Sequence, residues 1–367
     1  MFCWIHDTCC GNRCRYRRAV HSHALQKAGA DVTVYESGTP GSGQSAGESR
    51  IFRHAHDDVR LASFVRHSRA LWREWEADFG VELVSGAGAV AIGDSVEDKL
   101  RVLSGLPEVP IKLLTPGQLA AALPILADFQ GKAMLDAHGG AIRTSAAFRA
   151  LAGKLKDALV ADHVMAVRPT PGQGVEVRTG TRVDRFDHAV LCAGRGTAAL
   201  ARGAGLDIPV ELAAHARVTF RVRDVPPAPL PTFQDGSGVF GETGVYAAPS
   251  ADNLRYSVGL SETTDVRQDG SLADPAALES LAARAAAYVR TALPGLDPEP
   301  AGYVHCWVTR LPWGDDGVGI WSAGSVSAVA GHNLFKQAPA LGEALAETAL
   351  SGVVPAVLRP ESQLGRS

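Results

Sequence analysis

The sequence has no uninterrupted apolar run that approaches the roughly 20 residues needed to cross a membrane. The sequence also lacks a large excess of either charge, because 36 Lys and Arg residues and 39 Asp and Glu residues leave a formal net charge of −3. This balance gives no electrostatic reason to expect nucleic acid or an anionic membrane as a partner. The basic residues near the start are not followed by the apolar segment of a secretory signal. We therefore expect a cytoplasmic protein with neither kind of partner.

A glycine-rich phosphate loop is missing where its neighbours require one. Residues 23–37, HALQKAGADVTVYES, are typical of a helix end, a Gly turn, a buried strand and an acidic residue. A dinucleotide-binding unit places an apolar strand and a G-x-G-x-x-G loop before them, but residues 9–22 read CCGNRCRYRRAVHS. The side chains of Arg13, Arg15 and Tyr16 stand where the glycines belong. We therefore predict that the chain lacks a native first strand at the centre of its sheet, folds poorly and holds a dinucleotide weakly or not at all.

The same region is crowded with cysteines, and three interpretations stand side by side. Four of the six cysteines fall within residues 1–14: Cys3, Cys9, Cys10 and Cys14. With His6 they suggest a zinc or disulfide cluster, but adjacent Cys9 and Cys10 do not fit a C-x2-C pair, and reduced thiols are simpler. The third hypothesis is a wrong reading frame. Codon degeneracy in the next frame permits VVVIGAGIVGLSTA, which joins HALQKAG if one base was lost near codons 22 and 23. We expect no metal ion.

Length and periodicity predict two domains. The 367 residues exceed one ordinary core. Helices are expected at 64–80, 113–126, 146–160, 276–292 and 338–352, a hairpin at 81–94, and alternating strands at 216–224, 244–250 and 254–262. Because β-α-β patterns lie at the start, middle and end of the chain, we predict an α/β (α+β) fold. A Rossmann-like nucleotide-binding domain would comprise residues 1–85, 140–205 and 302–367, and a substrate domain with a mostly antiparallel sheet would comprise 86–139 and 206–301.

Charged residues follow the strand at 32–36. Glu36, at its end, occupies the place of an acid that accepts hydrogen bonds from a ribose, and the alternative is a solvated turn. Arg50 and Arg53 come three residues apart after a stretch of small residues. Two arginines this close need an anion or a carboxylate, unless they form an exposed basic face.

Three blocks of sequence carry a resemblance to a known family. GESRIFRHAH (47–56), VHCWVT (304–309) and GHNLFKQAPALGEAL (331–345) resemble, in order and spacing, the monomeric sarcosine oxidase and N-methyltryptophan oxidase family of the D-amino-acid oxidase superfamily. The resemblance implies FAD, a small-molecule amine or amino-acid substrate whose C–N bond is oxidised, and dioxygen as acceptor. A secondary or N-methyl amino acid would transfer a hydride to the flavin, and water would then hydrolyse the imine.

The resemblance also implies roles for single residues. Arg53 and Lys336 would bind the substrate carboxylate, Arg50 would lie near the flavin, and Tyr246 would line the pocket. Cys306 falls where the family forms a thioether to the flavin, although a buried strand cysteine is the simpler alternative. The residues that we expect to contact the cofactor are Glu36, Ser49, Arg50, Gly194, Cys306 and Gly331. The two glycines would let backbone pack against it. Apart from the resemblance, His54, His56, Asp57 and Asp58 suggest either a metal site or a polar helix or loop surface, and we expect the surface.

One departure from the family bears on the electron acceptor. The family has a lysine above the flavin, and the corresponding position in this sequence is Ser257. A histidine of the family's pocket corresponds to Ser261. Arg255, two residues before Ser257, is the cation that could replace the lysine. The alternatives are therefore a flavin dehydrogenase that ignores oxygen, and a flavin-free remnant or binding protein without the phosphate loop. A zinc-binding interaction protein ranks last. The sequence does not predict an oligomeric state.

Overall fold

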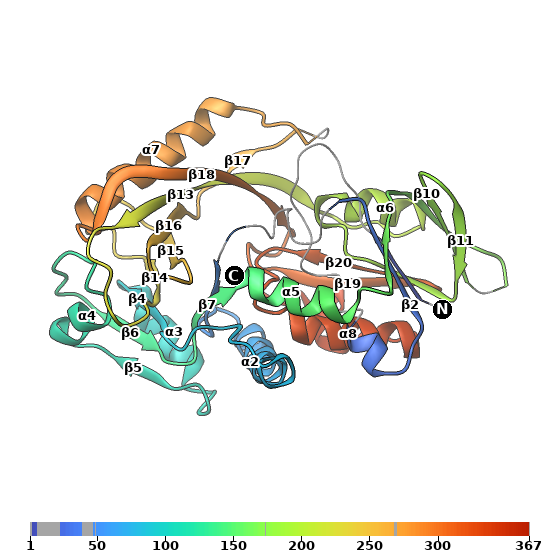
Figure 1. Ribbon diagram of the computed structural model, residues 1–367, viewed down its shortest axis with the longest axis horizontal. Helices are drawn as coiled ribbons and strands as arrows, with labels where there is room; N and C mark the ends of the chain where they lie inside the picture. The colour runs from blue at the N-terminus through green and yellow to red at the C-terminus, as the bar shows by residue number, and fades with distance from the viewer. Residues whose placement is uncertain are drawn as a thin grey trace.

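The computed structural model describes residues 2–5, 23–38, 47, 49–172, 174–267 and 270–366, with backbone alone described for residues 2–5 and Ser49. Figure 1 shows one sheet with β19 and β20 beside α8, and another region with β14, β15 and β16 beneath α7. Two long strands, β13 (Glu211–Val222) and β18 (Leu296–Arg310), run from one region toward the other.

The first sheet has six strands in the order β19–β20–β12–β1–β2–β8. Their bounds are Phe2–Ile5 (β1), Val32–Glu36 (β2), Leu159–Ala161 (β8), His188–Leu191 (β12), Val318–Ala323 (β19) and Val326–Gly331 (β20). The pairs among β8, β2, β1, β12 and β20 are parallel, and β19 adds to β20 in the antiparallel sense. Because parallel strands end at the same edge, Glu36, Leu191 and Gly331 lie along one edge of this sheet, where ligands bind in such folds.

The centre of this sheet corrects one prediction. β1 lies between β12 and β2, with Trp4 in register with Val190 and Val34. The prediction that the chain lacks a first strand there is therefore wrong: residues 2–5 supply it, upstream of the stretch in which we sought it. The missing glycine loop and the reading-frame hypothesis concern residues 6–22, which lie outside the described residues.

Two helices pack beside this sheet. α2 (Val59–Phe79) begins where Asp58 accepts a hydrogen bond from the backbone N of Arg60, and it ends at Gly80, whose φ of 64° suits glycine. α8 (Ala338–Ser351) follows β20 and contacts α2. Buried apolar residues from both helices and the sheet form one core. The helices predicted at 64–80 and 338–352 are confirmed, the first beginning earlier, at Val59.

Smaller elements complete this region. A three-stranded antiparallel sheet contains β9 (Val164–Pro169), β10 (Val175–Thr179) and β11 (Val183–Phe186). The helices are α5 (Thr144–Lys154), α6 (Thr197–Gly203) and the 3-10 turns Gly194–Gly196, Ala356–Leu358 and Pro360–Ser362. The helix predicted at 146–160 ends at Lys154, because residues 159–161 pair with β2 as a strand.

The second sheet has nine strands, and all its pairs are antiparallel except that of β4 with β14. Besides β13 and β18, they are β4 (Ala89–Ile92), β5 (Ile111–Leu113), β6 (Ala133–Asp136), β14 (Thr232–Asp235), β15 (Val245–Pro249), β16 (Arg255–Leu260) and β17 (Thr264–Asp265). α7 (Pro275–Ala292) packs on β13, β16 and β18, while α3 (Ser95–Leu103) and α4 (Pro116–Ala122) lie near the other end. The predicted strands in 216–262 and helix in 276–292 are confirmed, and Thr115 caps α4 in a capping box.

The hairpin predicted at 81–94 is wrong. The backbone N–H groups of Leu83 and Val84 donate to the carboxylate of Glu76 at 2.9 and 2.8 Å. Val84 bridges Ile142, and β4 pairs with β6 and β14 instead. Partners distant in the chain therefore replace the local pairing that the Gly-containing turn suggested.

Two ladders bring the site residues together. β13 and β18 pair along their length, and His215 lies directly opposite Cys306. The separate antiparallel pair of β3 (Ser49–Phe52) and β7 (Gly140–Arg143) positions Arg50 and the segment that follows it. The domain boundaries given above stay a prediction. Within the part of the chain that the structure describes, no helix combines the length and apolar character of a membrane span.

Candidate active site

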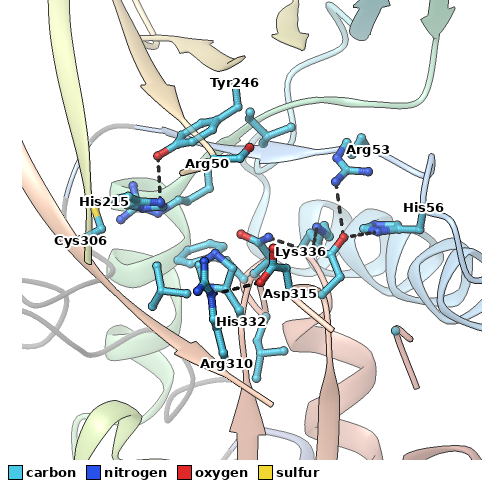
Figure 2. A pocket seen from close by; sticks show the side chains of 18 of the residues that line it. Arg50, Arg53, His56, His215, Tyr246, Cys306, Arg310, Asp315, His332 and Lys336 are labelled. Carbon is cyan, nitrogen blue, oxygen red and sulfur yellow. Dashed lines mark hydrogen bonds and ion pairs between the residues drawn. The ribbon is translucent and has the colours of Figure 1, made fainter. Parts of the chain in front are cut away.

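A cavity of about 490 Å³ lies among the ends of several elements. Its walls include residues of β3 and the segment after it, β13, β15, β16 and β18, the turn before β19 and the segment after β20. Figure 2 shows side chains from these separate elements pointing toward a common space. Segments remote in sequence therefore build one site.

The structure brings most of the predicted site residues to this cavity. Six of them line it: Arg50, Arg53, Gly194, Tyr246, Cys306 and Lys336. Arg50 is on β3, Tyr246 on β15 and Cys306 on β18, whereas Lys336 precedes α8. Gly194 opens the turn after β12 with a φ of 61°. Their roles toward substrate or cofactor stay proposals.

Three other predicted residues are not among those that line the cavity. Glu36 ends β2 with 2 % exposure, and its Oε1 accepts the backbone N–H of Gly38 at 3.1 Å. Ser49 begins β3. Gly331 has a φ of 146°, and a Cβ there would lie 2.3 Å from the carbonyl O of Gly317. The protein's own backbone therefore explains this glycine, and cofactor packing is not needed to account for it.

Arg53 and Lys336 meet at one carboxylate, that of Asp316. Its Oδ2 lies 3.5 Å from Arg53 Nη2, and its Oδ1 lies 3.9 Å from Lys336 Nζ. His56 Nδ1 contacts Oδ2 at 2.8 Å, and Asn333 Nδ2 donates to Oδ1 at 2.8 Å. The dashed lines from Arg53 and His56 in Figure 2 meet at one atom, and both contacts are with Oδ2 of Asp316. The two cations are thus near enough to hold one carboxylate between them.

The charges of this group follow from its burial. Desolvation, followed by repulsion from Lys336 and Arg53, lowers the pKa of His56 to about 3, so its imidazole is neutral at pH 7. Burial also lowers the pKa of Lys336 to about 8, although Asp316 opposes this shift. Burial disfavours an ionised Asp316, but Lys336, His56 and Arg53 together hold its pKa well below the usual range. At pH 7 two cations and one anion leave an excess of one positive charge.

A second group surrounds Cys306. His215 hydrogen-bonds the Cys306 thiol, and its Nδ1 lies 3.2 Å from the hydroxyl of Tyr246. Burial opposes ionisation, yet the bond to His215 and the charges of Arg217 and Arg50 lower the pKa of Cys306 to about 6. Burial raises the pKa of Tyr246 above its ordinary value, which keeps the phenol neutral. The site thus contains a thiolate in an electropositive setting.

Sequence reasoning missed four of these residues: His56, His215, Arg217 and Asp316. It assigned His56 to a polar surface together with His54, but both histidines are 2 % exposed, so that interpretation is wrong. His215 and Arg217 alternate with buried alanines and valine on β13, and this period of two was the available signal. Asp316 lies in a turn, where an aspartate has no distinctive pattern.

The two serines that replace the family's lysine and histidine also lie at the cavity. Ser257 and Ser261 both line it; Ser257 Oγ lies 2.8 Å from Thr219 Oγ1, and Ser261 Oγ donates to the carbonyl O of Gly244 at 2.7 Å. Arg255 is exposed and is not among the lining residues, so the suggestion that it replaces the lysine is wrong.

The donor set fits a flavin. Arg50 Nη1 and Arg217 Nη2 lie 3.2 and 2.9 Å from the point that a Cβ on Gly47 would occupy, so the two guanidinium groups are side by side. Arg217 Nε is buried without a hydrogen-bond partner among the described residues. Paired cations with an unused donor suit the negative charge that an isoalloxazine gains on reduction.

Comparisons with known proteins agree with a flavin at this site. The model of the family "FAD dependent oxidoreductase" matches residues 22–348. The peroxisomal sarcosine oxidase of Homo sapiens is 26% identical over 294 residues, which cover 74% of this chain and 72% of that protein. Two solved structures share the fold. NikD, an amino acid oxidase of nikkomycin biosynthesis, has a TM-score of 0.83 at 18% identity over 100% and 97% of the two chains. L-proline dehydrogenase from P. horikoshii has a TM-score of 0.80 at 19% identity over 98% and 96%.

These matches extend over most of the chain and confirm the predicted mixed α/β fold class, the expected cofactor and the resemblance itself. They support the chemistry at the level of amines or amino acids as substrates, and they leave the individual substrate open. The chain belongs to the family of FAD-dependent oxidoreductases that oxidise amino acids or amines.

Proposed function

We propose that the protein oxidises the C–N bond of a secondary or N-methyl amino acid, with dioxygen as the electron acceptor. Bound FAD would supply the hydride acceptor, and water would hydrolyse the imine product. The observation that carries the proposal is the placement of Arg53 and Lys336 around one carboxylate group. We also propose a cytoplasmic location, and the peroxisomal relative makes this worth checking.

The chain's own residues supply binding and orientation. A substrate carboxylate would join Arg53 and Lys336, where the excess positive charge attracts one anion. Charge-assisted hydrogen bonds to a planar guanidinium would fix its direction. Tyr246, neutral and buried, would form part of the wall that excludes water. Fixed orientation of the reacting C–N bond is then the main contribution of the protein to the rate.

Cys306 is the proposed site of covalent FAD attachment. Its support is the thiolate environment that His215, Arg217 and Arg50 create within the cavity. Arg50 and Arg217 would also hold the flavin ring, and Glu36 would bind the ribose of the adenosine. If Cys306 forms the link, acid precipitation of the wild-type protein leaves the yellow colour in the pellet, whereas the Cys306→Ser variant releases it. Free flavin from the wild-type protein would contradict this assignment.

The first experiment measures flavin and its reduction. We expect purified protein, reconstituted with FAD where necessary, to bleach anaerobically when mixed with one or more N-methyl or cyclic amino acids. A protein that binds no FAD under any of these conditions would instead support the flavin-free alternative.

A dehydrogenase is the second candidate, because Ser257 stands at the cavity where the family places a lysine. Admission of air after bleaching distinguishes the two. Rapid return of the yellow colour with release of hydrogen peroxide supports the oxidase. A flavin that stays reduced in air but is reoxidised by an artificial electron acceptor supports the dehydrogenase.

A further inference from the structure

Asp316 is a cavity residue that the sequence did not single out. It lies in the tight turn between β18 and β19, where the backbone N–H of Gly317 donates to the carbonyl O of Gly314 at 3.0 Å. The C-terminal segment packs against this turn: a Cβ on Gly365 would lie 2.2 Å from the carbonyl O of Asp316. The backbone of Asp316 is therefore held firmly in place.

The contacts of its carboxylate are uneven. The two neutral partners, His56 and Asn333, lie at 2.8 Å, which is an ordinary hydrogen-bond length. The two cations, Arg53 and Lys336, lie at 3.5 and 3.9 Å. Neutral donors thus anchor Asp316, while the cations keep longer and weaker contacts to it. Both cations can therefore turn toward a second carboxylate without releasing Asp316 from its anchors.

The protonation of His56 follows from the same geometry. An ionised carboxylate accepts hydrogen bonds and donates none, so Nδ1 of His56 must carry the proton in its contact with Asp316. The ring is buried and neutral, and it therefore adds no charge of its own to this cluster. Asp316 is the single counter-charge within ion-pair distance of Lys336 among the described residues.

We propose that Asp316 is a positioning residue that keeps Lys336 positively charged and leaves it, with Arg53, ready to bind the carboxylate of the substrate. The inference rests on the proposed function, because it assumes that Arg53 and Lys336 bind this group. A substrate with one carboxylate then completes the charge balance of the cluster. Loss of Asp316 leaves the buried Lys336 beside the half-buried Arg53 with no counter-charge, and Lys336 relieves the repulsion by giving up its proton.

The surroundings of Lys336 support this direction. Burial and Arg53 both lower the pKa of Lys336, and Asp316 is the group that raises it. Lys99 is near enough to Arg53 and Asp57 for their charges to act on its pKa, but it is not among the groups that shift the pKa of Lys336. His56 and Asn333 approach Asp316 rather than Lys336 and are uncharged. Lys336 binds an anion in its protonated form, so binding is present at low pH and is lost as pH rises through the pKa of about 8.

Acetate is a suitable probe, because it has the carboxylate and cannot be oxidised at a C–N bond. We would titrate the holoenzyme with acetate between pH 5.5 and 9.5, using calorimetry and the visible spectrum of the flavin. Wild-type affinity should fall with a midpoint near the pKa of Lys336. Asp316→Asn should lower this midpoint by about one pH unit or more, which makes acetate binding at pH 8 roughly fivefold weaker or more.

Asp315→Asn is the matched control. Asp315 is the preceding residue, is exposed and pairs with Arg310 at 3.1 Å, so the same change of charge one position away should leave the midpoint unmoved. Lys336→Met should abolish the midpoint, and Asp316→Asn added to it should cause no further shift. If the Asn variant does not fold by circular dichroism, Asp316→Ser removes the same charge with a smaller side chain.

The outcomes separate the inference from the proposed function. Acetate that fails to bind the wild-type holoenzyme at any pH would refute the carboxylate clamp and the inference with it. Acetate that binds with a pH midpoint that neither Asp316 variant moves would leave the clamp intact and overturn the role of Asp316. An equal shift in Asp315→Asn would also overturn it, because a general field effect would then explain the result.

Discussion

The ionisation of Cys306 gives a prediction that needs no substrate. With a pKa of about 6, roughly 90 % of the thiol is ionised at pH 7. His215→Phe removes the hydrogen bond that does most to favour the thiolate, while Arg50 and Arg217 remain. A hydrogen bond to a charged group contributes about 1.5–3 kcal/mol, which corresponds to one or two pH units. The pKa of Cys306 should therefore rise to roughly 7–8 in the variant.

The assay is alkylation of flavin-free protein by iodoacetamide from pH 5 to 9, followed by mass spectrometry of the peptide that contains Cys306. The midpoint of the pH–rate profile must be measured rather than the rate at one pH, because a thiolate of higher pKa is also more nucleophilic. Cys192, buried at 4 % exposure, serves as an internal comparison. A wild-type midpoint above pH 8, or an unchanged midpoint in His215→Phe, would refute the reasoning.

Three further predictions concern the clamp, the fold and the cofactor. Lys336→Met should lower kcat/KM for a carboxylated amine by about 10- to 150-fold, the loss of one charge-assisted contact. Lys99→Met removes a half-buried lysine near Arg53 that does not line the cavity, and it should retain near-normal kinetics. Gly331→Ala should lower the free energy of unfolding by about 2–4 kcal/mol in denaturant titrations, since its Cβ would meet backbone at 2.3 Å. The control is Gly29→Ala, where φ is 80° and no atom lies within 4 Å of the added Cβ. This change should lower the free energy of unfolding by about 1 kcal/mol. Glu36→Gln should weaken FAD binding about tenfold by fluorescence titration, and unchanged affinity would remove Glu36 from the cofactor site.

Local patterns predicted much of the fold correctly. The helices at 276–292 and 338–352 have apolar periodicity together with clear start or stop signals, and the structure has both. The hairpin at 81–94 failed because its Gly-rich turn is a local signal, whereas its strands pair with segments about 40 to 140 residues away. Strand partners of this kind are decided by tertiary packing, which periodicity does not contain.

In the site, too, local patterns identified some residues, and tertiary packing decided the others. Arg50, Arg53, Lys336 and Cys306 stood in blocks of sequence that resemble a family, and the structure brings all four to one cavity. The importance of His215 depends on the register of β13 against β18, which places it opposite a cysteine 91 residues later. No local feature of the sequence specifies that register. Asp316 was missed for a related reason, since its partners come from two segments that are remote from each other in the sequence, residues 53–56 and 333–336.

The first strand of the six-stranded sheet was sought at the wrong place in the sequence. We expected it directly before residue 23, because a phosphate loop is short, and we judged it absent when residues 9–22 did not fit. The backbone of residues 2–5 instead pairs with β2 and β12. A strand of four residues gives too little periodicity to be found from sequence without its partners.

The central claim is that Arg53 and Lys336 bind the carboxylate of an amine substrate beside the flavin. The most direct measurement compares the anaerobic rates of flavin reduction by matched pairs that differ only in this group, such as N-methylglycine with dimethylamine and proline with pyrrolidine. The account predicts bleaching by the carboxylated member of at least one pair and a rate at least 100-fold lower with its partner, as expected for loss of about 3 kcal/mol of charge-assisted binding. Equal or faster bleaching by the amines that lack a carboxylate would contradict it.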